Sequence, residues 1–308
     1  MPNPRLTLPR PPALAQPLRW RATHALAILL ALLLALGGCS RVTVAYQNAD
    51  FFVRQYASGY LDLSTAQLAR WEPRLDAELA RHRAEELPYL AAFFDQLLAA
   101  SRAGFARERM DCLLDGFKEL YRRQARTAVN LAAPLLADLS PAQIDALARK
   151  FSEEYAEDQA DLAKRDWSWE KRKRTKRYVA AIEDWTGELS PQQRSIVAEV
   201  TGGMPDSESS VIAYRARQRD ALIALLRDQS DAARISAFMT AWLVDFSDLP
   251  PDLRAAGDSI AEHMSTLFVR LGASFDERQR AHLDDRLRQL RDDLLRLQKH
   301  SHLAPSSC

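Results

Sequence analysis

Apolar residues recur at steps of three and four from Phe51 to the C-terminal end of the chain, which is the spacing of one face of a helix. No stretch of four or more residues alternates cleanly with β-branched or aromatic residues, so the pattern predicts no sheet. The predicted helices, with bounds good to a few residues, are 46–58, 65–86, 89–101, 104–136, 141–166, 168–187, 191–200, 207–229, 231–246, 251–271 and 277–299. We therefore predict an all-α fold, an irregular bundle of about ten helices.

Four of the predicted helix starts share a short motif. Residues 63–67, 139–143 and 189–193 read Leu-Ser-x-x-Gln, and 275–279 read Phe-Asp-x-x-Gln. Ser or Asp can accept a hydrogen bond from the backbone N–H three residues on, and the Gln side-chain oxygen can accept one from the backbone N–H of the cap residue. The unequal spacing of the motifs excludes a solenoid. The motif predicts well-capped helices, with recognition of a partner as the alternative.

The overall charge is close to neutral, with 42 Lys and Arg against 41 Asp and Glu. A dedicated nucleic-acid binder usually carries a strong basic excess, so nucleic acid is not an expected partner. Only 10 glycines occur, which leaves little material for phosphate-binding loops. No nucleophile elbow, zinc-protease motif or nucleotide loop is present. We predict no enzyme activity and no small-molecule substrate.

The N-terminal segment has the pattern of a secretory signal. Four arginines precede an apolar run at 25–36, and the first acidic residue is Asp50. The run is shorter than the roughly 20 residues that a membrane span needs. It ends in Leu36-Gly37-Gly38-Cys39-Ser40, which resembles a bacterial lipobox. The resemblance implies cleavage before Cys39 and a covalent lipid on its thiol.

These features predict four parts of the chain: a lipoprotein signal peptide at 1–38, a lipidated N-terminus and tether at 39–45, an all-helical domain at 46–300 and a flexible tail at 301–308. Ser40 in place of Asp resembles lipoproteins that are forwarded to the outer membrane. The alternatives to cleavage and lipidation at Cys39 are an uncleaved membrane anchor and a signal peptide cut at another residue.

The two remaining cysteines are Cys112 and Cys308. An exported protein can form a disulfide between them, but the interpretation favoured by the helical pattern around Cys112 is a free, buried thiol. No Cys/His spacing typical of a metal site occurs. His82 and Glu85 lie one helical turn apart, but no second copy of the pair accompanies them. We predict no metal and no cofactor other than the lipid on Cys39.

The most prominent charge feature is the segment 164–177, which holds eight basic residues and Trp167 and Trp169. Acidic residues lie just upstream at 153–161, and pairs such as Asp161–Arg165 are available at helical spacing, which predicts a solvated, charge-paired face. Neighbouring cations point in different directions, so one acidic helix cannot neutralise all of them. The alternative is contact with anionic envelope material such as lipid headgroups or cell-wall polymer. The candidate contacts are Lys171, Arg172, Lys173, Arg174, Lys176 and Arg177.

Four separated blocks resemble a family of uncharacterised proteobacterial lipoproteins. They are 45–50 (AYQNAD), 60–64 (YLDLS), 82–88 (HRAEELP) and 183–191 (EDWTGELSP). The resemblance implies an all-helical exported domain behind a lipid anchor and brings no assigned activity. The repeated Leu-Ser-x-x-Gln motif is also similar to Leu-Ser/Thr-x-x-Gln sequences of small periplasmic stress chaperones.

The expected function is that of a non-enzymatic lipoprotein, anchored in the outer membrane and facing the periplasm, which binds envelope proteins or polymers. The alternative is a periplasmic holdase-type chaperone with an apolar groove.

Overall fold

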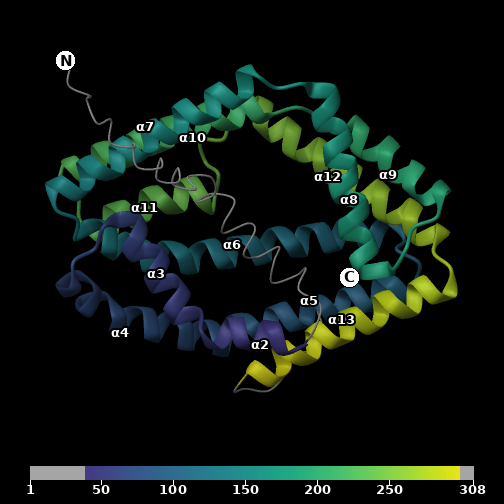
Figure 1. Ribbon diagram of the computed structural model, residues 1–308. Coiled ribbons are helices and arrows are strands. Elements are labelled where there is room, and N and C mark those ends of the chain that lie inside the picture. The colour runs from purple at the N-terminus through teal and green to yellow at the C-terminus, as the bar shows by residue number, and fades with distance from the viewer. Residues whose placement is uncertain (1–38, 299–308) are drawn as a thin grey trace, which may run out of the picture. The chain divides into compact units, whose positions relative to one another are not determined.

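The computed structural model describes residues 39–298, and this part of the chain consists of helices and short connections without a strand (Figure 1). The α-helices are α2 (Cys39–Gln47), α3 (Ala49–Leu61), α4 (Thr65–Arg81), α5 (Leu87–Arg102), α6 (Arg107–Ala137), α7 (Pro141–Ala163), α8 (Trp167–Thr186), α9 (Pro191–Gly203), α10 (Glu208–Arg227), α11 (Ala232–Leu243), α12 (Pro251–Ser274) and α13 (Glu277–Leu297). A π-helix, η1 (His82–Glu86), joins α4 to α5. The predicted all-α fold is confirmed.

Two of the four predicted parts of the chain, the signal peptide at 1–38 and the tail at 301–308, are outside the described residues. The segment 39–45, expected as a tether, lies within α2. Cys112 is disulfide-bonded, so the favoured interpretation of a free thiol was wrong.

The four motifs cap helices as predicted. Ser64, Ser140, Ser190 and Asp276 each accept a hydrogen bond from the backbone of the glutamine three residues on, and each glutamine bonds back to the cap. Both halves of the capping box are therefore present at the starts of α4, α7, α9 and α13.

The capping glutamines also bond to one another in pairs. Gln67 Nε2 donates to Gln143 Oε1 over 3.0 Å, and Gln143 Nε2 donates to Gln67 Oε1 over 2.9 Å. Each amide also donates to a backbone carbonyl near the other helix start, at Asp138 and Asp62 respectively. The two caps are thus joined across 76 residues of sequence.

The other two caps repeat this arrangement. Gln193 and Gln279 exchange hydrogen bonds of 2.9 and 3.0 Å and donate to the carbonyls of Ser274 and Glu188. One pair therefore fastens the turn between α3 and α4 to the turn between α6 and α7. The other fastens the turn between α8 and α9 to the turn between α12 and α13. The recurrent motif accordingly has a long-range structural role beyond capping.

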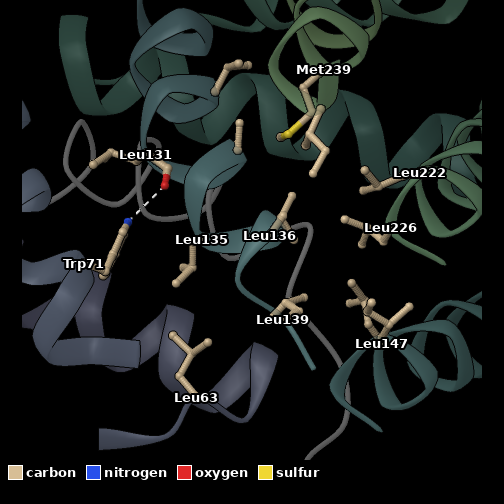
Figure 2. Close-up of a cluster of buried hydrophobic side chains, with 14 of the residues drawn as sticks. Leu63, Trp71, Leu131, Leu135, Leu136, Leu139, Leu147, Leu222, Leu226 and Met239 are labelled. Carbon is tan, nitrogen blue, oxygen red and sulfur yellow. Dashed lines mark hydrogen bonds between the residues drawn. The ribbon is translucent and has the colours of Figure 1, made fainter. Parts of the chain in front are cut away.

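The largest apolar cluster lies between α3, α4, the second half of α6, α7, α10 and α11 (Figure 2). Trp71 is buried there, and its indole nitrogen donates to the carbonyl of Leu131 over 2.9 Å. The bond leaves no polar atom of the ring unsatisfied in the core. The other members of this cluster labelled in Figure 2 are Leu63, Leu135, Leu136, Leu139, Leu147, Leu222, Leu226 and Met239.

Two further clusters complete the core. One packs α5 against α13, with the first turns of α6 and parts of α2 and α12. The other packs α8 and α9 against α12. The helix α6 has 31 residues and is about 46 Å long. It contributes Met110 and Leu113 to the α5–α13 cluster and Val129 to Leu136 to the Trp71 cluster, so it runs through both.

We expect Ser140→Ala and Ser190→Ala each to lower the free energy of unfolding by about 0.5–2 kcal/mol, because each removes a side-chain cap. Urea denaturation of the full chain measures the change. Ser195→Ala is the matched control, since Ser195 is an exposed interior residue of α9. If both cap variants unfold like the parent protein but lose binding to a partner, the recognition alternative is correct.

Candidate functional site: the basic face of α8

The first turn of α8 is fixed by Asp166. Its carboxylate accepts hydrogen bonds from the backbone nitrogens of Ser168 (2.9 Å) and Trp169 (3.2 Å) and from the Ser168 hydroxyl (2.7 Å). These bonds, the one from the Ser168 hydroxyl foremost, lower the pKa of Asp166. The cap thereby fixes the first helical turn, which contains Trp167 and Trp169.

Trp167 gathers three cations around its ring. The charged groups of Arg165, Lys171 and Arg174 lie 4.8, 5.3 and 5.1 Å from the ring centroid. Cations within about 6 Å of an indole face are attracted by the ring quadrupole. The ring therefore offsets part of the repulsion within this basic segment.

Two of these cations are committed to the fold. Arg165 binds Asp206 with two contacts of 2.8 and 2.9 Å and Glu208 at 3.1 Å. Arg174 donates to the carbonyl of Met204 over 3.2 Å, and its burial lowers its pKa. Both arginines hold α8 against the connection between α9 and α10. Arg174, a candidate contact from the sequence, is thus engaged in packing.

The exposed cations lie on one side of the helix. Arg172, Lys173, Lys176 and Arg177 are exposed and fall within an arc of about 140° at 100° per residue. Trp169, 48% exposed, lies within the same arc, with the Lys173 ammonium 4.4 Å from its ring centroid. We call these five residues the basic face.

Acidic residues neutralise this face only weakly. Lys173 approaches Glu170 at 3.9 Å. Within residues 39–298, Arg172, Lys176 and Arg177 form no ion pair with an acidic side chain.

Two of the acidic residues upstream bind another helix. Glu154 binds Arg219 at 2.6 Å, and Asp158 lies 3.5 Å from Arg215, both arginines being on α10. These two carboxylates therefore bind α10 rather than the basic segment.

A second polar cluster lies where η1 crosses α6. Arg123 binds Glu86 with two contacts of 2.6 and 3.0 Å, and Arg81 lies 3.5 Å from the same carboxylate. The Glu86 side chain is only 5% exposed. A π-helix often occurs at functional positions, but here its acidic side chain is fully occupied by two arginines.

His82 and Glu85 do not form a metal site. The His82 ring is bonded at Nδ1 to the Tyr46 hydroxyl (2.9 Å) and at Nε2 to Gln124 (2.7 Å), while Glu85 binds Arg81 at 3.2 Å. In the described part of the chain, no group of three or more His, Cys, Asp or Glu side chains could hold a metal ion.

We expect His82 to make the stability depend on acid pH. Burial is the main cause that lowers its pKa, while the Gln124 hydrogen bond and the Glu86 and Glu78 charges act in the opposite direction. Since the folded pKa lies below the unfolded value of about 6.5, the unfolded chain binds the proton first. The free energy of unfolding should therefore fall as the pH drops below about 6.5.

His82→Gln should remove this component and leave the rest of the pH profile intact. Urea denaturation between pH 7.5 and 5 compares the two proteins. A parallel loss of stability in both would show that other groups cause the acid sensitivity.

One exposed surface was missed by the sequence reasoning. Phe51, Phe52 and Tyr56 of α3 are exposed, although the apolar periodicity placed Phe51 at the start of the core pattern. Gln55 and Gly59, which share this side of the helix at helical spacing, carry no charge. This uncharged side is the sequence signal that could have revealed the exposed surface.

The fold and the basic face define an all-helical protein with an exposed cationic and aromatic surface. The chain belongs to a family of unknown function, DUF6279, whose profile matches residues 59–241 and so covers all of α8. No curated protein and no solved structure matched the chain. In the described residues, no helix combines the length and apolarity that a membrane span requires.

Proposed function

We propose that this protein is a non-enzymatic lipoprotein, anchored through Cys39 to the periplasmic side of the outer membrane, that binds anionic envelope material through the basic face of α8. The anchor is supported by the cationic leader, the apolar run at 25–36 and the lipobox around Cys39. The observation that carries the binding function is the single arc of four exposed cations and Trp169.

The chemistry of the basic face fits phosphate or carboxylate groups arranged along a surface or a chain. Arginine binds such groups through two parallel hydrogen bonds, whereas lysine contributes a mobile point charge. The exposed indole of Trp169 adds an apolar contact beside these charges. Lipid headgroups and cell-wall polymers both present this chemistry, so the experiment must separate them.

The test is the double reversal Lys173→Glu/Lys176→Glu, which leaves the packed Arg174 in place. We expect sedimentation with cell-wall sacculi or with anionic phosphatidylglycerol vesicles to fall roughly tenfold, because two attractive charges become repulsive. Binding by the parent protein should also weaken with salt, since exposed charges are screened within about 8–10 Å at physiological ionic strength. Loss for sacculi alone identifies the polymer, and loss for vesicles alone identifies the lipid.

The matched control is Lys118→Glu/Arg122→Glu on α6, which changes the net charge equally at two exposed positions. Both double variants should change the free energy of unfolding by less than about 0.5 kcal/mol for each substitution. Equal effects of the two variants on sedimentation would reduce the binding to net charge. Unchanged sedimentation with the α8 variant would contradict the proposed function.

A further inference from the structure

The outer side of α2 and α3 is exposed and uncharged. The exposed residues between Thr43 and Tyr60 are Val44, Gln47, Asn48, Phe51, Phe52, Gln55, Tyr56 and Gly59. We call these eight residues the outer face of α2–α3. Charged residues make up 27% of the whole chain, and the exposed residues of α13, for example, include Glu277, Arg278 and Asp285. An exposed face of this length without a charge is therefore exceptional in this molecule.

The opposite side of the two helices is held firmly. Tyr46 packs against the α5–α13 cluster and bonds to His82. Val53, Ala57 and Tyr60 pack against the Trp71 cluster, and the Tyr60 hydroxyl donates to Glu154 on α7 over 3.2 Å. These contacts fix which side of α2–α3 points away from the fold.

The two charged residues of α3, Asp50 and Arg54, lie at the edge of the outer face at helical spacing and bind each other, with side chains 41% and 37% exposed. Arg54 lies 3.1 Å from Asp50 and 3.5 Å from Glu72 of α4. Phe51 and Phe52 meet edge to face, with ring centroids 5.6 Å apart, and Tyr56 stacks on Tyr60 at 5.7 Å. The aromatic rings thus form a fixed apolar surface rather than isolated exposed side chains.

The position of this face in the chain indicates its occupant. Val44 lies five residues after Cys39 in the sequence. Phe52 lies 13 residues after Cys39, which is at most about 20 Å along a helix. A lipid on Cys39, or an uncleaved apolar segment at 25–36, would place the bilayer surface directly before α2. Aromatic side chains favour the membrane interface, and charged ones oppose entry into it.

We propose that the outer face of α2–α3 lies in the interfacial layer of the membrane that carries the N-terminus. This inference rests on the part of the proposed function that attaches the N-terminus to a membrane, through a lipid on Cys39 or through the apolar segment at 25–36. The acyl chains retain the protein, and the outer face orients the helical domain on the bilayer surface, as an amphipathic helix does when it lies in the interface.

The experiment uses the full-length, processed protein reconstituted in zwitterionic phosphatidylcholine vesicles, so that the basic face finds little net charge. The probe is a phosphatidylcholine with a diazirine near its glycerol backbone, and mass spectrometry maps the carbene adducts. Peptides within 43–61 should be labelled roughly tenfold more than peptides within 107–126, since only the former enter the interface. The latter segment contains Phe117, which is exposed to the same 56% as Phe51 but adjoins Lys118 and Glu119.

Phe51→Ser/Phe52→Ser should reduce the labelling of 43–61 to the level of the control segment, and Phe117→Ser should leave it unchanged. Both variants alter exposed side chains, so the fold should be retained. Thermal unfolding of each variant checks this. Equal labelling of the two segments in a protein that carries lipid on Cys39 would overturn the inference and leave the anchor standing. Strong labelling of 43–61 without lipid on Cys39 would support the inference and refute the anchor. A dimer in detergent that protects 43–61 would overturn it in favour of a second copy of the chain.

Discussion

Arg123→Met is expected to lower the free energy of unfolding by about 3 kcal/mol, because it leaves the buried carboxylate of Glu86 without its principal partner. The expected value is at the low end for a broken buried ion pair. The reasons are that Arg81 remains 3.5 Å from Glu86 and that Arg123 itself is partly exposed.

Chemical denaturation of four proteins tests this expectation. The double variant Glu86→Leu/Arg123→Met should recover most of the loss, since replacing both partners by apolar groups removes the unpaired charge. The control Arg122→Met changes a neighbouring exposed arginine and should stay within about 0.5 kcal/mol. An Arg123→Met protein as stable as the control, or a double variant as unstable as Arg123→Met, would contradict the structure at η1.

Gln193→Leu is expected to lower the free energy of unfolding by about 2–3 kcal/mol. The substitution removes the bond to the Ser190 cap, the donation to the Ser274 carbonyl and the exchange with Gln279. All of this occurs at a side chain that is buried. The matched control is Gln192→Leu, at the exposed neighbouring position.

A double-mutant cycle with Gln279→Leu isolates the pairing. The sum of the losses in unfolding free energy of the two single variants should exceed the loss of the double variant. Each single change also leaves the partner amide unsatisfied, whereas the double change does not. Strict additivity would show that the two glutamines act only as independent caps.

The sequence predicted the local part of this design. Ser64, Ser140, Ser190 and Asp276 could be assigned as caps because a capping box is contained in four consecutive residues. The pairing of the caps could not be predicted. Gln193 and Gln279 are 86 residues apart, and the same motif would serve equally well unpaired.

For the candidate site, too, the sequence predicted the local features but not the contacts with other helices. Composition singled out the basic segment, and helical spacing showed that one acidic helix could not neutralise it. Periodicity alone could not reveal that Arg174 donates a hydrogen bond to the Met204 carbonyl while Lys176 stays exposed, because that depends on how α8 meets the connection after α9. The partners of Glu154 and Asp158 could likewise not be predicted, since both lie on α10 and are remote in sequence.

The outer face of α2–α3 illustrates the opposite difficulty. Phe51 and Phe52 carry the same apolar signal as core residues, and only the packing of Tyr46 and Tyr60 shows which side of the helices is covered. A tether was expected at 39–45, where the chain forms α2.

The lipid anchor is best tested by the mass of the N-terminal peptide of the processed protein, purified from membranes in detergent. We expect this peptide to begin at Cys39 and to carry a diacylglyceryl group on the thiol. Cys39→Ser should abolish both the cleavage and the modification. An unmodified Cys39, or a mature N-terminus at another residue, would refute the anchor.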